Sequence, residues 1–243
     1  MFECGADAVM LDLEDAVPSG LKSRARALVA QAAAAKPCWV RTNRAGTEEC
    51  RLDVEALRDA VAGFRLPKVE SADDVEWVAA RAPGVPLDCT IESARGVMNA
   101  YAIASAPACA LISYGGVDLA LDLGLSGGEV ETLYARSAIV VAARAAGKPP
   151  PSDGVHTRLD DVDGLRSAAE AARRLGFFGK SAIHPRQVPI INEVFTITPE
   201  ELEWAGRVLA AFEAAGGAAT RLDDGEFIDL AVAERARHLR DLA

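Results

Sequence analysis

The sequence predicts an α/β fold built on a parallel sheet, and three observations lead to this prediction. Short apolar runs rich in β-branched residues alternate with Ala-rich stretches along most of the chain. The apolar runs recur at intervals of roughly 25–35 residues, the spacing of strand–helix–strand units with parallel strands. The 243 residues, 50% of them hydrophobic, can bury the core of one α/β barrel or of two small domains.

Seven apolar runs, bounded by polar or turn-forming residues, are predicted to be strands. They cover residues 7–14, 37–43, 64–69, 86–92, 110–115, 151–155 and 178–183. A closed (β/α)8 barrel needs eight strands, and an open sheet edge is costly. The opening "MFECGADAVMLDLED" is typical of a helix end, a glycine stop and then a second strand. We therefore expect a TIM (β/α)8-type barrel that lacks its first strand in this chain.

Helices are predicted between the strands, where Ala-rich stretches carry apolar residues at helical spacing. They cover residues 21–35, 48–60, 72–81, 94–105, 129–147 and 162–175. Ser71 precedes one of them, and acidic residues follow it in the first turn, where the positive end of a helix stabilises negative charge. Gly147 and Gly176 are expected to end their helices.

The C-terminal residues are predicted to form a helical appendage outside the sheet. Residues 198–201, "TPEE", form a capping box with proline at the first helical position and begin a helix over 199–214. A Gly-rich stretch, a "DDG" turn and a final amphipathic stretch follow. The predicted organisation is a barrel domain over residues 1–195, which carries the catalytic site, and a helical extension over 196–243, which acts as a lid.

Composition and charge restrict the class of protein. The formal net charge of −10 argues against a general nucleic-acid binder but leaves room for a local basic pocket. No apolar run reaches the roughly 18 residues that span a bilayer, and no signal-peptide pattern opens the chain. The five cysteines are scattered and form no CxxC pair, which predicts free thiols in a reducing, cytoplasmic environment.

Charged side chains are predicted to gather at one edge of the sheet, because the carboxyl ends of parallel strands meet there. Asp12 and Glu14 share a strand face, since side chains alternate along a strand. Glu92 and Asp118 are 26 residues apart, which places them on adjacent strand ends, roughly 5 Å from each other. Two such carboxylates repel unless a proton or cation lies between them, and hard oxygen ligands suit Mg²⁺. The alternative, that each caps a helix or pairs with an arginine, carries equal weight.

Two basic residues are expected at the same edge. Arg41 either holds a substrate carboxylate with its guanidinium fork or forms a salt bridge with Asp12 or Glu14. Lys68 is a candidate Schiff-base lysine, but surrounding acids would stabilise its ammonium, which favours a charge-balancing role. His184, at the end of the last strand, is expected to be structural.

Eight stretches, in order along nearly the whole chain, resemble the citrate lyase β-subunit-like family of the HpcH/HpaI aldolase superfamily. They are "GADAVMLDLEDAV", "VRTN", "LPKVES", "IESARGV", "YGGVDLALDLG", "ARSAIVVAARAAGKPPPSDGVH", "DVDGLRSAAEAARRLGFFGKSAIHPRQV" and "TPEELEWAGRVLAA". The resemblance implies a TIM-barrel CoA-ester lyase that assembles as a homotrimer or hexamer. The departure from the family is at the N-terminus, where the first strand and helix are not matched.

The resemblance also implies roles for individual residues. Glu92 and Asp118 match the family's Mg²⁺ carboxylates, and Arg41 matches the arginine that holds the oxo-acid carboxylate. Asp229, in "GEFIDLAVAERA", matches an aspartate of a C-terminal lid that is thought to reach a neighbouring subunit's site as acid/base. Burial there would raise its pKa towards working pH, whereas in the alternative Asp229 only caps the last helix.

The expected function is Mg²⁺-dependent, reversible carbon–carbon cleavage of a 3-hydroxyacyl thioester. Substrates such as malyl-, citramalyl- or citryl-CoA, or an acyl-carrier thioester, would give an acetyl thioester and a 2-oxo acid such as oxaloacetate. The metal on Glu92 and Asp118 binds the oxo-acid half, Arg41 fixes its carboxylate, and Asp229 exchanges the proton at the acetyl carbon. The residues expected to orient this set are Asp12, Glu14 and Lys68.

Two other functions are considered. A class II pyruvate-type aldolase would act on free hydroxy-oxo acids without CoA, but the C-terminal extension suits a long acyl carrier better. A non-catalytic oxo-acid-binding subunit would keep the fold, but the presence of Arg41, Glu92 and Asp118 together argues against it. No nucleic-acid or membrane partner is expected.

Overall fold

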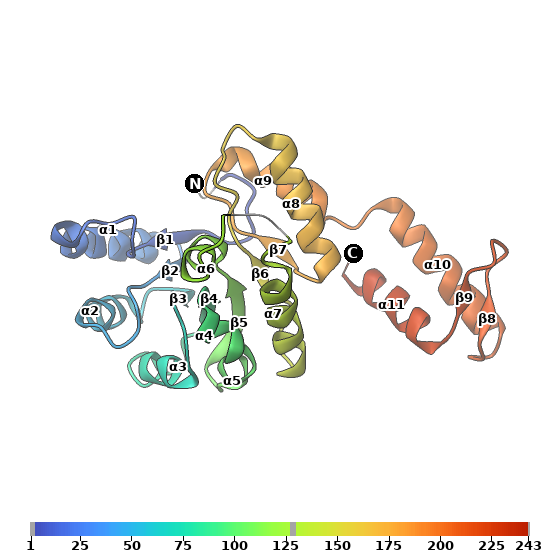
Figure 1. The fold of residues 1–243 in the computed structure, drawn as a ribbon, viewed down its shortest axis with the longest axis horizontal. Helices are drawn as coiled ribbons and strands as arrows, with labels where there is room; N and C mark the ends of the chain where they lie inside the picture. Colours follow the sequence, from blue (N-terminus) through green and yellow to red (C-terminus); the bar gives the residue numbers. More distant parts are fainter. Residues whose placement is uncertain (1–2, 127–129, 243) are drawn as a thin grey trace. The chain divides into compact units, whose positions relative to one another are not determined.

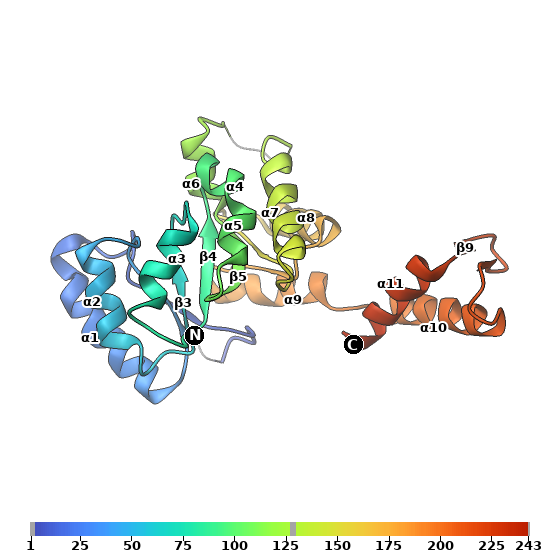
Figure 2. The same cartoon turned by 90° about the horizontal axis from the view of Figure 1, so that it is seen from below.

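The computed structural model describes residues 3–126 and 130–242 of the chain. These residues form two compact units, Met1–Phe195 and Thr196–Ala243, which we treat separately. The first unit contains a parallel sheet with helices outside it, and the second is a helical hairpin with two short strands (Figures 1 and 2).

The first unit contains seven parallel strands that pair in the order in which they occur in the sequence. All seven predicted strands are present, and most are shorter than predicted because only their central residues keep the ladder hydrogen bonds. They are β1 (Met10–Asp12), β2 (Trp39–Arg41), β3 (Gly63–Leu66), β4 (Leu87–Ile91), β5 (Cys109–Tyr114), β6 (Ser152–Asp153) and β7 (Gly179–Lys180).

The sheet is a curved half-barrel rather than a closed eight-stranded barrel. Within residues 3–126 and 130–242, β1 pairs with β2 alone and β7 with β6 alone, so the two edges are not hydrogen-bonded to each other. The curvature is visible in one contact, because Arg65 in β3 donates from Nη1 to Ser181 Oγ, just after β7, at 3.2 Å. The expected TIM-type barrel without its first strand is therefore confirmed only in part, as a seven-stranded parallel half-barrel.

Helices follow the strands and cover the outside of the sheet (Figure 1). Their bounds are α1 (Lys22–Ala35), α2 (Glu48–Leu57), α3 (Ala72–Ala79), α4 (Ala94–Met98), α5 (Ala100–Ser105), α6 (Gly116–Asp122), α7 (Leu133–Ala145), α8 (Val162–Leu175) and α9 (Val188–Phe195). Two short 3₁₀ turns, Ser19–Leu21 and Pro185–Gln187, precede α1 and α9. Two of these helices, α6 and α9, are absent from the sequence prediction.

Other helix predictions differ in detail. The helix expected over 94–105 is divided at Asn99, which has φ −101° and donates from its side chain to the Glu70 carbonyl oxygen at 2.7 Å. The helix expected over 129–147 is α7, and residue 129 lies outside the described residues. The predicted caps are confirmed at Ser71, which forms a capping box with Asp74, and at Gly176, which ends α8 with φ +98°.

The core of the first unit lies between the sheet and its helices. Fully buried side chains from the strands, such as Phe64, Leu66 and Ile91, pack with Ile103 and Ile139 from the helices. Among the described residues, no helix is long and apolar enough to cross a membrane. The packed outer face leaves the opposite face of β1–β5 to polar side chains.

The second unit has its own small core. Helices α10 (Pro199–Ala214) and α11 (Leu230–Asp241) pack together, and the strands β8 (Thr220–Arg221) and β9 (Phe227–Ile228) pair antiparallel between them. Val208 and Ile228 are fully buried in this core. The predicted capping box that begins α10 is present between Thr198 and Glu201.

Candidate active site

The carboxyl ends of β1 to β5 bring six predicted site residues into one group, which we call the rim. Each lies at the last residue of its strand or within a few residues after it. The rim consists of Asp12, Glu14, Arg41, Lys68, Glu92 and Asp118. The alternation of side chains and the parallel order of the strands account for this grouping, as the sequence predicts.

Arg41 is held by two carboxylates of β1. Its Nε and Nη2 donate to the two oxygens of Asp12 at 2.8 and 2.7 Å, and its Nη1 lies 3.0 Å from Glu14 Oε2. Burial opposes the charge on both groups, but their mutual hydrogen bonds raise the pKa of Arg41 and lower that of Asp12. The predicted salt bridge is therefore present. Since each terminal nitrogen carries a second N–H that these contacts do not use, Arg41 can still bind an anion.

Lys68 contacts the rim through both its backbone and its side chain. Its N–H donates to Glu92 Oε1 at 2.6 Å, and its Nζ lies 2.6 Å from Glu14 Oε1 and from Asp15 Oδ2. Burial opposes the ammonium charge, but the hydrogen bonds that it donates to Asp15 and Glu14 raise the pKa of Lys68. The ammonium therefore stays protonated, which disfavours a Schiff-base role.

The backbone of Lys68 is strained. Among the described residues, it is the only non-glycine residue with positive φ, at +54°. The left-handed conformation costs a residue with a side chain about 1 kcal/mol. This strained residue is the one whose N–H donates to Glu92 Oε1.

Glu92 is a buried carboxyl group at the centre of the rim, with 5% of its surface exposed. Burial raises the pKa of Glu92 to about 7, and the negative charges of Asp118 and Glu14 add to this effect. The hydrogen bond from the Lys68 backbone acts in the opposite direction. Two residues earlier on the same strand face, Thr90 Oγ1 is buried without a hydrogen-bond partner in the described structure. A buried polar atom without a protein partner therefore lies on the strand face that leads to Glu92.

The end of β5 passes close to Glu92. A Cβ on Gly115 would lie 2.2 Å from Glu92 Oε2, so only glycine fits there. Gly116 then begins α6, and Asp118 lies in the first turn of this helix, 3.9 Å from Lys68 Nζ. The Gly-Gly pair thus lets the β5–α6 connection bring a second carboxylate to the rim.

The donor set of the rim fits a hard divalent cation. Glu92 and Asp118 supply carboxylate oxygens, and their mutual repulsion, which helps to raise the pKa of Glu92, would be relieved by a cation. Within the described part of the chain, no group of three or more His, Cys, Asp or Glu residues is arranged to hold a metal. Two protein ligands with the remaining positions left to water and substrate is the arrangement that Mg²⁺ favours.

A second polar group lies deeper on the same face of the sheet and was missed by sequence reasoning. Arg65 Nε donates to Asp88 Oδ2 at 2.6 Å, and Ser113 Oγ donates to Asp88 Oδ1 at 2.6 Å. The available signal was the spacing of Asp88, Thr90 and Glu92, which puts all three on one strand face. This network supports β4 beneath Glu92.

Asp229 lies in the second unit, at the N-cap of α11. Its Oδ1 accepts a hydrogen bond from the Val232 N–H at 3.0 Å, so the capping alternative is present in the structure. The apolar residues beside Asp229 differ in their exposure. Ile228 is fully buried within its own unit, where it packs with residues of α10 and α11, whereas Phe227 and Leu230 are 61% and 60% exposed.

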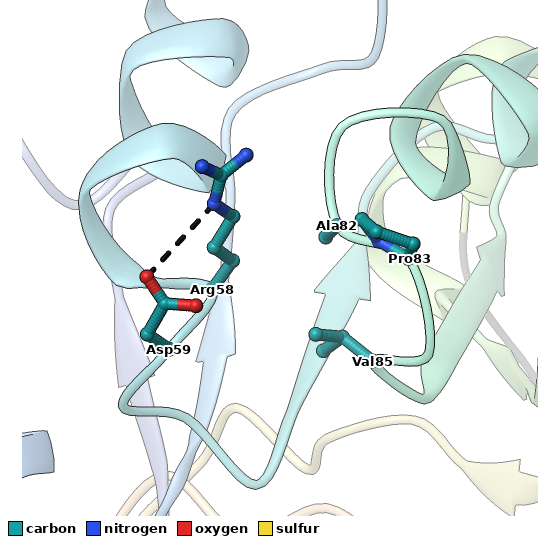
Figure 3. A pocket seen from close by; sticks show the side chains of 5 residues that line it. All are labelled: Arg58, Asp59, Ala82, Pro83 and Val85. Atoms are coloured by element: carbon teal, nitrogen blue, oxygen red, sulfur yellow. Dashed lines mark ion pairs between the residues drawn. The ribbon is translucent and has the colours of Figure 1, made fainter.

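Two further features lie apart from the rim chemistry. A surface hollow of about 280 Å³ lies between the end of α2 and the turn before β4, lined by Arg58, Asp59, Ala82, Pro83 and Val85 (Figure 3). It lies at the opposite end of the strands from the carboxylates, so it does not belong to this site.

His184 accepts a hydrogen bond from the Arg186 N–H at 3.1 Å as an N-cap, which is a structural role.

The fold and the rim define a class: a parallel α/β half-barrel with a carboxylate, arginine and lysine site at its strand ends. The chain belongs to the HpcH/HpaI aldolase/citrate lyase family, whose match covers residues 1–185. The resemblance found in the sequence is thereby confirmed, and the relatives place the chain among its citrate lyase β-subunit-like members.

Individual relatives match nearly the whole chain. A (3S)-malyl-CoA thioesterase of Cereibacter sphaeroides is 39% identical over 235 residues, which are 92% of this chain and 82% of the relative. Citrate lyase subunit beta of Leuconostoc mesenteroides is 36% identical, with 98% of this chain and 86% of the relative covered. The structure of CitE from Mycobacterium tuberculosis in complex with magnesium, acetoacetate and coenzyme A has a TM-score of 0.85 and 34% identity, covering 97% of this chain and 89% of that one.

Proposed function

We propose that this protein is a Mg²⁺-dependent carbon–carbon lyase acting on a 3-hydroxyacyl-CoA thioester, such as malyl-, citramalyl- or citryl-CoA. The observation that carries the proposal is the buried Glu92 carboxyl group, which interacts electrostatically with Asp118 and with Arg41 and forms with Asp118 a pair of acids suited to a cation. The structure of a similar protein has been solved with magnesium, acetoacetate and coenzyme A. These are a divalent ion, an oxo acid and a thiol carrier, the three components that such a reaction uses.

Glu92 and Asp118 are the residues that would hold Mg²⁺. When bound, the ion supplies positive charge that stabilises negative charge developing on an oxygen of the oxo-acid half. Gly115 keeps space for the Glu92 carboxylate, and the Lys68 N–H fixes the orientation of one of its oxygens. The protein thus prepares the ligand geometry before substrate arrives.

Arg41 would bind the carboxylate of the oxo-acid half. Asp12 accepts hydrogen bonds from Nε and Nη2, and Glu14 lies beside Nη1, so the side chain is fixed while one N–H on each terminal nitrogen stays available. A planar pair of donors matches a carboxylate better than the single charge of a lysine would.

The reaction needs two proton transfers, one away from the hydroxyl group and one to a carbon atom, so no proton is consumed overall. As the carbon–carbon bond breaks, its electron pair passes to the carbon next to the thioester, and the 3-hydroxyl loses its proton to become a carbonyl. The carbon that receives the electron pair then takes up a proton. We assign that transfer to Asp229, contributed by a neighbouring copy in a homotrimer or hexamer. The exposed Phe227 and Leu230 beside it support docking on another surface.

A second candidate activity is hydrolysis of the same kind of thioester. It is favoured by the relatives named (3S)-malyl-CoA thioesterase, which are 39% identical to this chain over 235 aligned residues. The two activities give different products, because a lyase leaves the thioester intact in acetyl-CoA, whereas a thioesterase releases free CoA.

One assay separates these functions. Purified protein is incubated with malyl-CoA and Mg²⁺, and acetyl-CoA, glyoxylate and free thiol are measured together. A lyase gives acetyl-CoA and glyoxylate in equal amounts, whereas a thioesterase gives free thiol and malate. Turnover of free hydroxy-oxo acids without CoA would support the class II aldolase instead, and oxo-acid binding without any turnover would support a non-catalytic subunit.

A further inference from the structure

The Lys68 ammonium lies among the carboxylates that would hold the metal. It is 2.6 Å from Glu14 Oε1 and 3.9 Å from Asp118 Oδ1, and its charge acts on Glu92 as well. Among the described residues, Lys68 is the cation that the structure places within 4 Å of Asp118. A divalent ion on Glu92 and Asp118 would therefore bind close to a fixed positive charge.

Arg41 cannot take over this position. Its guanidinium contacts Asp12 with two nitrogens and Glu14 with the third, and among the described residues its ion pairs are with these two acids rather than with Asp118. Lys68 instead joins Glu14 and Asp15, which follow β1, to Asp118 on α6. Its ammonium repels a divalent cation and attracts a substrate anion, so the two effects have opposite signs.

We infer that Lys68 couples metal binding to oxo-acid binding, an inference that rests on the proposed function of the rim. With Lys68 present, the metal alone binds weakly because of the nearby ammonium. An oxo-acid bound at the same place supplies the negative charge that offsets this repulsion, so metal and oxo-acid bind together more strongly than either does alone. Thermodynamic reciprocity requires that each ligand raise the affinity for the other by the same factor.

The backbone and the side chain of Lys68 can be tested separately. The N–H that orients Glu92 belongs to the main chain and is retained when the side chain is changed. Lys68→Met keeps an unbranched side chain at a position with φ +54° and removes the charge together with the hydrogen bonds from Nζ to Glu14 and Asp15. Lys68→Arg keeps the charge, and Arg51→Met is a matched control that removes one positive charge from the exposed surface of α2.

The experiment measures binding of Mn²⁺ alone, by its electron paramagnetic resonance signal, and then binding of Mn²⁺ at increasing pyruvate. We expect Lys68→Met to bind Mn²⁺ about tenfold more tightly than the wild type in the absence of pyruvate, because the variant lacks one positive charge that repels the ion. Pyruvate should bind more weakly to this variant, and the factor by which pyruvate tightens Mn²⁺ binding should fall. Arg51→Met should behave as the wild type, and Lys68→Arg, which keeps the charge, should bind Mn²⁺ alone more weakly than Lys68→Met does.

The opposite outcomes are distinct. If Lys68→Met weakens Mn²⁺ and pyruvate binding together, Lys68 only supports the structure of the rim and the inference is wrong. Unchanged binding of both ligands would also overturn it. Glu92→Gln measured in parallel tests the proposed function separately. Normal Mn²⁺ binding by that variant would show that Glu92 is not a metal ligand, whatever the result for Lys68.

Discussion

At the scale of single residues, the rim is a set of charges whose protonation is set by burial. Arg41 and Lys68 remain protonated because carboxylates surround them, while Glu92 is the residue that burial and neighbouring acids move towards neutrality. The chemistry of the site therefore depends on whether a proton or a metal cation is bound to the Glu92 carboxyl group.

Glu92 should make the metal-free protein less stable as pH rises. The pKa of Glu92 is about 7 in the folded protein against an ordinary value of 4.5, so between these values the folded state binds more protons than the unfolded state. Stability falls through this window, and the loss is on the order of 2–3 kcal/mol. Glu92→Gln has no such proton to lose. The difference in urea unfolding free energy between the two proteins should change across this pH range, and a constant difference would contradict the assignment.

Arg41→Lys should lose the paired hydrogen bonds to Asp12 and to the substrate carboxylate while keeping a positive charge. We expect kcat/KM to fall by a factor equivalent to about 2–4 kcal/mol of transition-state stabilisation. Steady-state kinetics with malyl-CoA measures this loss. An unchanged kcat/KM would mean that Arg41 serves only as the ion-pair partner of Asp12 and Glu14.

At the scale of elements, close approach between β4 and β5 is what shapes the rim. Gly115→Ala would put a methyl group 2.2 Å from Glu92 Oε2 and must displace that carboxylate. We predict at least a tenfold loss of Mg²⁺ affinity with the secondary structure retained, about 1.4 kcal/mol or more. Gly179→Ala, where an added Cβ meets nothing within 4 Å, is the matched control. A titration with Mg²⁺ measures the affinity, and circular dichroism measures the secondary structure. Equal affinity in both variants would contradict the prediction.

The strands and the rim acids could be predicted from the sequence because both follow local rules. Apolar runs mark buried strands, and alternation places Asp12 with Glu14 and Thr90 with Glu92 on one face. The helix α9 was missed because "VPIINEVF" is rich in β-branched residues that also suit a strand. The positive φ of Lys68 and the close contact at Gly115 could not be predicted, since each depends on a neighbouring strand rather than on local sequence.

At the scale of the whole molecule, the two units carry complementary parts of the proposed chemistry. The first unit holds the rim, and the second holds Asp229 at the N-cap of α11. The barrel prediction is met in part, because the seven predicted parallel strands are present but, within the described residues, the two edges of the sheet are not hydrogen-bonded to each other.

Mixing two inactive variants tests the shared site. Glu92→Gln subunits keep a good Asp229, and Asp229→Asn subunits keep a good rim, so exchange between them should create some complete sites. We expect partial recovery of lyase activity after mixing under conditions that allow subunit exchange, with unmixed samples as controls. If mixed oligomers form, as mass spectrometry can show, and no activity returns, Asp229 does not act across a subunit interface.

The central claim is that Glu92 and Asp118 jointly hold the catalytic Mg²⁺. The most direct measurement is the Mg²⁺ dependence of malyl-CoA cleavage by the wild type, Glu92→Gln and Asp118→Asn, with Mn²⁺ binding measured on the same preparations. Because each substitution removes one charged ligand of a two-ligand site, we predict that both variants remain folded, bind Mn²⁺ weakly and lose activity. Near-wild-type turnover by either variant at limiting Mg²⁺ would contradict the claim.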